Sequence, residues 1–226
     1  MKGMYGMGDF RWDIVASYGP MFLKGAVVTI QLTMIGIICG LILGLIISFM
    51  RMSKVPFIYW PAVWYINIFR GTPLFIQILI IHFAVVPAIF GPSQGPFFSG
   101  ALALALNSTA YVAEIFRAGI QSIDRGQMEA ARSLGMTHWM AMREVILPQA
   151  FKRMIPPFGN EFIVLLKDSS LVAIIAAPDL TQAGRMAMAA TYRPLEAYLP
   201  VAVIYLILTL TLSRFVNYLE RKLDTK

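Results

Sequence analysis

The longest early segment without a charged residue runs from Gly25 to Met50, 26 residues that include no Asp, Glu, Lys or Arg. As an α-helix with a rise of about 1.5 Å per residue, it would reach ~39 Å, whereas the hydrocarbon core of a bilayer is about 30 Å thick. A second uncharged stretch, of 43 residues from Gly71 to Ala113, is interrupted by Pro87, Pro92 and Pro96, so it indicates parts of two spans. These segments predict a protein embedded in a membrane.

The low content of charged residues supports this prediction. Only 14% of the 226 residues are charged and the mean hydropathy is +0.68, whereas about a quarter of the residues of a soluble domain are charged. The net charge of +7 indicates basic cytoplasmic loops rather than nucleic-acid binding, so the expected surroundings are membrane lipid. The single cysteine, Cys39, lies inside the first span, which excludes a disulfide framework and a cysteine metal site.

Hydropathy and helix-breaking residues predict an all-α membrane protein, a single domain over residues 1–226 with five spans. The second predicted span is interrupted by Arg70 and by Gly71-Thr72-Pro73, and the fourth contains Lys167 and Asp168. The spans are placed near 22–50, 56–88, 96–118, 157–177 and 196–216.

The distribution of Lys and Arg predicts the orientation. With the N-terminus outside, twelve of these residues lie on the inner side and five on the outer side, and basic residues concentrate in cytoplasmic loops. The C-terminus is then cytoplasmic, as is the long loop at about 119–156. The mixed polar and methionine-rich stretch 178–194 is expected outside, as a helix on the surface.

The long loop contains a predicted helix start and an apolar patch. Asp124, with Gln127 three residues later and Glu129 in the same turn, is a typical helix start with a capping-box spacing. Gly135 then separates this helix from a second one that presents bulky apolar residues. Such a patch either binds a partner chain or packs against the spans of the protein itself, and the sequence leaves both open.

Several motifs together resemble one family. Glu129-Ala130-Ala131, Gly135 and Val145-x-Leu147-Pro148 resemble the EAA loop of ABC importer permeases, the binding-protein-dependent transport inner-membrane components. Three further segments are similar to the polar amino-acid permease subfamily, namely Phe69 to Leu74, Asn107 to Glu114 and Lys167 to Leu171.

The resemblance implies a type I ABC importer core of five spans in a prokaryotic inner membrane. It implies a second permease chain, identical or paralogous, a dimer of ABC ATPase subunits that binds ATP and Mg, and an extracytoplasmic binding protein. We expect that binding protein to dock on 178–194. The chain has no phosphate-binding loop G-x-x-x-x-G-K-[ST], so we expect a transporter subunit without a cofactor or catalytic residues of its own. The implied ATPase-coupling residues are Glu129, Ala130, Ala131, Leu134, Gly135, Met136, Trp139, Leu147 and Pro148.

Polar residues inside the spans are candidates for the substrate path, because each costs about 2.5–3.5 kcal/mol at mid-bilayer when charged. One stripe on the third span consists of residues spaced i, i+4 and i+7, and a second lies on the fourth span. The alternatives are a pairing of Glu114 with Arg117, and either a buried ion pair or an unwound helix at Lys167. The candidate substrate-binding residues are Asn107, Tyr111, Glu114, Glu161, Leu165 and Asp168.

These acids favour a basic amino acid (arginine, lysine or histidine) as substrate, with glutamine or another polar amino acid as the alternative. A different class of protein, an intramembrane hydrolase, would use Ser93 with His82, because Gly91 to Gly95 fits G-x-S-x-G. We interpret that segment as a turn between two helices, and His82 as satisfied by a backbone or hydroxyl partner. The two histidines lack metal-site spacing, so no metal is expected.

Small residues recur on the first span at Gly36, Gly40 and Gly44, spaced by four. Such spacing permits close helix packing in lipid. It predicts a contact within the subunit or with its neighbour, with no chemistry attached.

Overall fold

The computed structural model describes residues 10–92 and 94–222, and the regular elements within them are helical, as the predicted all-α class requires. Two π-helical turns, Ile81–Val85 and Met142–Ile146, and a 3-10 helix, Ser169–Ile175, lie between the α-helices. The α-helices are α1 (Trp12–Arg51), α2 (Pro56–Gly71), α3 (Leu74–Ile80), α4 (Val86–Phe90), α5 (Pro96–Gln121), α6 (Arg125–Ser133), α7 (His138–Ala141), α8 (Leu147–Asp168), α9 (Leu180–Thr191) and α10 (Pro194–Lys222).

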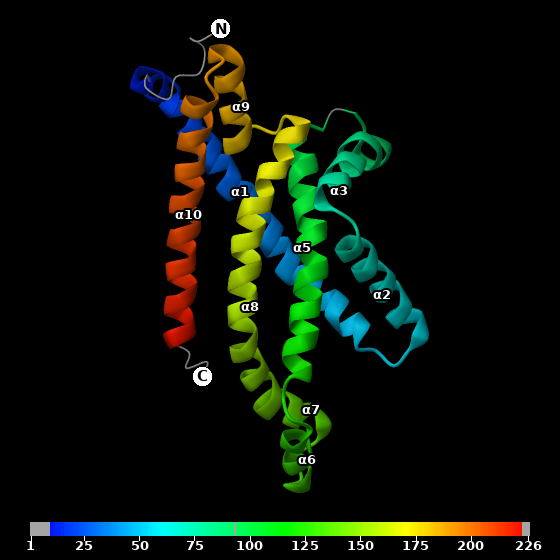
Figure 1. Cartoon of the computed structure of the whole chain (residues 1–226). Helices are drawn as coiled ribbons and strands as arrows, with labels where there is room; N and C mark the ends of the chain where they lie inside the picture. Colours follow the sequence, from blue (N-terminus) through cyan, green and yellow to red (C-terminus); the bar gives the residue numbers. More distant parts are fainter. Residues whose placement is uncertain (1–9, 93, 223–226) are drawn as a thin grey trace.

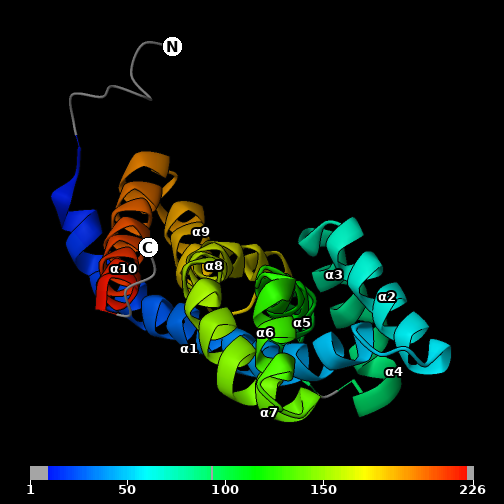
Figure 2. The ribbon, with the colours of Figure 1, turned by 90° about the horizontal axis from the view of Figure 1, so that it is seen from below.

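Helix α1 is the element on which the others assemble. It packs most extensively on α5 and also contacts α2, α8, α9 and α10. Seen from below, α5, α8 and α10 lie nearly end-on and α1 crosses them (Figure 2). Its 40 residues correspond to about 60 Å of helix, twice the thickness of a hydrocarbon core, so α1 is oblique and extends beyond the span expected at 22–50.

Several helix ends and connections lie at one of two ends of the molecule. The start of α1, the start of α10 and α9 lie at the top of Figure 1, whereas α6, α7 and the end of α10 point to the bottom. Successive long helices α5, α8 and α10 therefore run in alternating directions.

Glycines on α1 produce the close contact with α5. A Cβ atom on Gly40 would lie 2.6 Å from the Ser108 hydroxyl oxygen, and one on Gly44 would lie 2.6 Å from Val112 Cγ1. A Cβ on Gly36 would lie 2.9 Å from Leu165 Cδ2 of α8. The predicted small-residue contact is confirmed, and it lies within the subunit.

The second predicted span, 56–88, is not a straight helix. The segments Pro56–Gly71 and Leu74–Phe90 meet at 109°. Pro73 lacks an amide hydrogen and disfavours a helical conformation of the residue before it, and Thr72 is accordingly extended (φ −122°, ψ 148°). The segment is therefore two helices joined at a sharp break.

Both π-helical turns come directly before a proline-containing helix start. Ile81–Val85 leads into α4, whose second residue is Pro87, and Met142–Ile146 leads into α8, whose second residue is Pro148. A proline removes one backbone donor and crowds the preceding turn, and a wider turn accommodates both effects.

The long helix α8 begins earlier than the predicted fourth span at 157–177. It starts at Leu147, inside the predicted loop, and continues after Asp168 as the 3-10 helix Ser169–Ile175. Ala176 then adopts a left-handed conformation (φ 57°) that ends the helical run before α9. The remaining predicted spans, 96–118 and 196–216, fall within α5 and α10.

Length and hydropathy qualify α1 and α10 as membrane spans in the described part of the chain. The bent pair α2 with α3–α4 is a third candidate if it counts as one span. Helices α5 and α8 do not reach the same hydropathy, since both carry polar residues such as Asn107 and Glu161. The number of spans thus stays a prediction.

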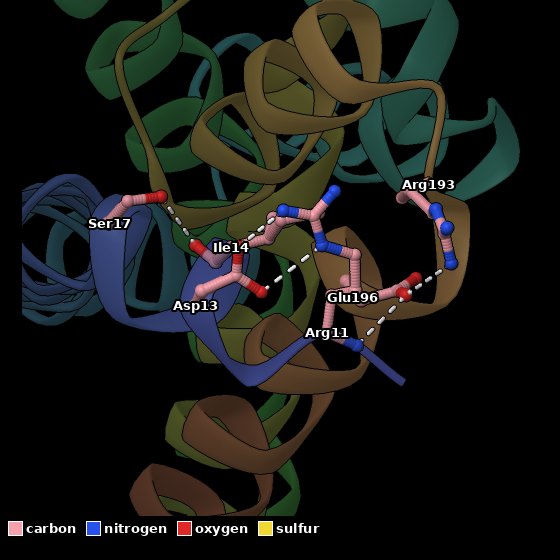
Figure 3. A network of polar contacts seen from close by, with 6 residues as sticks. All are labelled: Arg11, Asp13, Ile14, Ser17, Arg193 and Glu196. Atoms are coloured by element: carbon pink, nitrogen blue, oxygen red, sulfur yellow. Dashed lines mark hydrogen bonds and ion pairs between the residues drawn. The ribbon is translucent and has the colours of Figure 1, made fainter. Parts of the chain in front are cut away.

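A polar network attaches the residue before α1 to the start of α10 (Figure 3). The backbone N–H of Arg11 donates to Glu196 Oε1 (3.3 Å), which also accepts from Arg193 Nη1 (3.2 Å). The Arg11 guanidinium pairs with Asp13 at 2.5 Å, which raises the pKa of Arg11 and lowers the pKa of Asp13. The buried Glu196 thereby holds the beginnings of α1 and α10 together.

Candidate functional site

The loop between α5 and α8 is a short helical hairpin. The Asp124 carboxylate caps α6 by accepting from Gly126 N (2.7 Å), and Thr137 caps α7 by accepting from Met140 N (3.2 Å). The Gln127 side chain contacts Gln149 (3.4 Å) instead of completing a capping box with Asp124. Gly135, at φ 88°, forms the turn between the helices, a conformation that favours glycine.

Most of the predicted coupling residues face solvent. Leu134 and Trp139 are 84% and 70% exposed, whereas Ala131 is buried. Helices α6 and α7 project from the end of the molecule (Figure 1), and their main contacts are with each other and with the adjoining π-helical turn. The alternative that this apolar patch packs on the spans is therefore wrong for Leu134 and Trp139. Glu129, Ala130, Gly135 and Pro148 are exposed, and Met136 and Leu147 are half-buried.

Asn107 belongs to the break between α2 and α3. Its buried side-chain amide donates to Gln77 Oε1 (2.9 Å) and to the Phe69 carbonyl (3.5 Å). Gln77 in turn donates to the carbonyls of Phe69 (2.8 Å) and Thr72 (3.0 Å), which the end of α2 leaves without helical partners. These contacts fix the break against α5.

Glu114 is the centre of a cluster of arginines. Arg117 makes the short contact (Nη2–Oε2 2.6 Å), while Arg70 and Arg51 lie at 3.7 Å and 4.0 Å. Glu114 thus pairs with Arg117, as the alternative interpretation predicts, and it also joins the ends of α1 and α2 to α5. The Arg70 guanidinium lies over the Tyr111 ring at 5.3 Å.

Tyr111 and Glu114 open onto a cavity of about 480 Å³ at this end of α5. Arg70 of α2, Arg153 of α8 and Ala118 of α5 also line it. Neither Asn107 nor the α8 candidates line this cavity.

Glu161 and Leu165 lie on the face of α8 that packs inward. Leu165 is 1% exposed and Glu161 8%, and among the described residues no ion pair within 4 Å involves Glu161. The buried hydroxyl of Ser108 on α5 approaches the Glu161 carboxyl without reaching hydrogen-bond geometry. Glu161 is thus a buried acid with spare hydrogen-bonding capacity.

Lys167 and Asp168 are the last two residues of α8. The buried ion pair that the sequence offered as one alternative is not formed by either residue in the described part of the chain. Lys167 is exposed and Asp168 half-buried, and the ion pairs of the described part include neither. The change to a 3-10 helix after Asp168 is milder than local unwinding.

The six substrate candidates therefore fall into separate places: Asn107 at the helix break, Tyr111 and Glu114 at the cavity, Glu161 and Leu165 in the α8 face, and Asp168 at its end. Sequence reasoning missed Gln77 and Arg153. Gln77 could have been found as the polar residue of an apolar run, four positions after Pro73.

His82 has the hydroxyl partner that was predicted. Its Nδ1 lies 2.9 Å from Ser99 Oγ, and Ser99 is fully buried. Ser93, required by the hydrolase interpretation, lies outside the described residues.

Comparisons with known proteins identify the family of the chain. The model of the family described as "binding-protein-dependent transport system inner membrane component" matches residues 23–225. The arginine transport system permease protein ArtQ of Bacillus subtilis is 42% identical over 91% of this chain and 94% of its own length. The glutamine transport system permease protein GlnP of Escherichia coli is 37% identical over 95% and 98%.

Solved structures give the same result. One titled "Crystal structure of an amino acid ABC transporter with histidines" superposes with a TM-score of 0.89 at 46% identity, over 95% of this chain and 99% of that one. The inward-facing MetNI methionine ABC transporter, at 21% identity and a TM-score of 0.77, supports the fold alone. In such systems ATP is bound by a partner ATPase and a binding protein takes part, so the permease itself is not a catalyst. The chain therefore belongs to the binding-protein-dependent transport system inner membrane components, as a multi-pass inner-membrane permease of the polar amino-acid subfamily of ABC importers.

Proposed function

We propose that this chain forms, with a second permease chain, the path of an amino-acid importer with five spans per chain, an outer N-terminus and a cytoplasmic α6–α7 hairpin. A dimer of ABC ATPases binds ATP and Mg and seats this hairpin. The observation that carries the proposal is the exposed Leu134 and Trp139 on a hairpin that projects from the molecule. Large apolar side chains exposed on a rigid turn indicate a protein-binding surface.

Co-purification with the ATPase tests the coupling surface. Trp139→Ala and Leu134→Asp are expected to reduce ATPase recovery and substrate-stimulated ATP hydrolysis at least tenfold, because aromatic anchors at interfaces contribute about 2 kcal/mol or more. Trp12→Ala is the matched control, an exposed aromatic residue (73%) at the start of α1, at the end of the molecule opposite the hairpin (Figure 1). Recovery of the ATPase at wild-type yield from both variants contradicts the coupling assignment.

We propose a basic amino acid, arginine, lysine or histidine, as the substrate. Glu161 supports this, since a buried carboxylate without an ion-pair partner attracts a cationic group. The 42% identity to the arginine permease ArtQ supports it too. Glutamine is the alternative substrate. L-cystine is a further candidate, because the L-cystine transport system permease protein TcyB of Bacillus subtilis is also 42% identical to this chain. Stimulation of ATP hydrolysis by each amino acid, with the binding protein present, separates them.

We propose that the binding protein docks on 178–194 at the end opposite the hairpin. Helix α9 presents Met186 (54% exposed) and is followed by Tyr192, while its Leu180, Ala183 and Ala187 are buried against α1 and α10. Movement of the ATPases would reach this end through α8, which continues into the 3-10 helix that precedes α9.

A further inference from the structure

The cluster around Glu114 contains more positive than negative charge. Arg117 contacts the carboxylate at 2.6 Å through Nη2 and at 3.1 Å through Nε. Arg70 and Arg51 lie farther away, at 3.7 Å and 4.0 Å. Because the Glu114 carboxylate is already paired with Arg117, it neutralises the positive charges of Arg70 and Arg51 only in part.

This uncompensated charge faces the cavity of about 480 Å³ at the end of α5. Arg70 reaches the cavity from α2, and Arg153 reaches it from α8, where it donates to the Ser122 carbonyl. Two guanidinium groups from different helices thus share one concave space, whose volume is within the range of about 300–1,000 Å³ typical of ligand sites. Guanidinium groups bind carboxylates through paired hydrogen bonds, and a concave surface strengthens their field.

We propose that this cavity is an oxyanion site that binds the carboxylate of a free amino acid at the end of the molecule that carries α6 and α7. Arg70 and Arg153 contact the carboxylate, and Glu114 with Tyr111 holds Arg70 in place. The site recognises amino acids as a class, because each carries this group. It rests on the proposed function, and it is distinct from the buried Glu161, which does not line the cavity.

A cysteine in the cavity wall reports on its occupancy. Ala118 is exposed and lines the cavity, and Cys39 is the single native cysteine, so Ala118→Cys combined with Cys39→Ser gives one reporter thiol. The complete transporter is placed in nanodiscs of neutral phosphatidylcholine and labelled with a sulfonate-bearing methanethiosulfonate. L-arginine and L-glutamine are expected to slow the labelling, whereas agmatine, which is arginine without the carboxylate, is not.

Variants of the two arginines test the contacts. Arg70→Gln and Arg153→Gln are each expected to raise the amino-acid concentration for half-protection about tenfold or more, the usual effect of losing a hydrogen bond to a charged group. Lys152→Gln is the matched control, since Lys152 neighbours Arg153 on α8 but does not line the cavity. Arg153→Lys retains the charge and restores part of the protection. If Arg70→Gln lowers the melting temperature, the test rests on Arg153→Gln, because Arg153 is exposed and its substitution is not expected to affect folding.

Three results overturn the inference. One is unprotected labelling in the presence of both amino acids, and another is equal protection by agmatine. The third is protection that arises only when phosphatidylglycerol is added to the nanodiscs, which assigns the cavity to a lipid phosphate. Uptake of amino acids by wild-type proteoliposomes is measured separately, so that failure of the proposed function is distinguished from failure of this site.

Discussion

Glu161 is the residue whose environment most favours a substrate contact. It is 8% exposed on α8, and in the described part of the chain no ion pair within 4 Å neutralises it. Glu161→Gln nearly keeps the shape and removes the charge. We expect the apparent affinity for a basic amino acid to fall about 10- to 150-fold, with basal ATP hydrolysis and assembly near normal. Uptake into proteoliposomes measures this. A lower melting temperature with unchanged uptake per folded molecule would instead make Glu161 structural.

Asn107, another of the candidate substrate-binding residues, is hydrogen-bonded to groups of the protein itself. Asn107→Leu leaves the buried Gln77 carbonyl oxygen without its donor, which costs about 1–3 kcal/mol of folding free energy. We expect a lower melting temperature with little change in amino-acid affinity. Gln77→Leu costs at least as much, because it also removes the donor to the Phe69 and Thr72 carbonyls. The double variant costs less than the sum, since neither Asn107 nor Gln77 is then left without the other. Additive losses, or a selective loss of affinity, would contradict the structural role.

The pairing of α1 with α5 depends on its glycines. A Cβ on Gly44 would lie 2.6 Å from Val112 Cγ1 and 2.9 Å from its Cβ, and a β-branched side chain cannot rotate away. Gly44→Ala is therefore expected to destabilise the fold by about 1–3 kcal/mol despite the better helix propensity of alanine.

Gly19→Ala on the same helix is the control for this substitution, because its Cβ would meet no atom of another helix within 4 Å. Its gain in helix propensity is opposed by Pro20, which disfavours a helical conformation of the residue before it, so we expect the free energy of unfolding to change by less than about 1 kcal/mol. Thermal unfolding in detergent compares the two. Equal melting temperatures for both variants would show that the contact is not tight.

Helix starts and breaks that depend on neighbouring residues could be predicted from the sequence. The orientation of one helix relative to the next could not. Gly71-Thr72-Pro73 indicates an interruption, because proline restricts the residue before it. The 109° bend depends on Gln77 and Asn107, which meet across 30 positions of the sequence. Likewise α8 begins at Leu147, inside the predicted loop, since a π-helical turn before Pro148 accommodates the proline.

The candidate site shows the same limit. The spacing of Asn107, Tyr111 and Glu114 places them on one stripe of α5, but Asn107 contacts Gln77, whereas Tyr111 and Glu114 both contact Arg70. Gln77 lies on α3 and Arg70 on α2, and the residue spacing along α5 cannot predict where those two helices pack.

At the scale of the whole molecule, the orientation of the chain in the membrane can be tested with one reporter cysteine at each end. His138 in α7 and Met186 in α9 are exposed at the bottom and top of Figure 1. In a Cys39→Ser background, His138→Cys should react with an impermeant thiol reagent only in inverted or permeabilised membranes, and Met186→Cys in right-side-out vesicles. The reverse pattern would place the N-terminus inside, against the distribution of basic residues.

Whether the broken segment α2–α4 crosses the membrane decides the number of spans. A 109° bend fits either a broken span or a re-entrant loop, and non-helical backbone at membrane depth is tolerated only where protein buries it, as the contacts of Gln77 and Asn107 do here. A span places Ser53 and Gln94 on opposite sides, whereas a re-entrant loop returns both to one side. With five spans, Ser53→Cys is expected to react only from the cytoplasmic side and Gln94→Cys only from the outside. Reaction of both from one side would leave α2–α4 as a re-entrant loop, and the orientation of α5 and every later helix relative to α1 would then reverse.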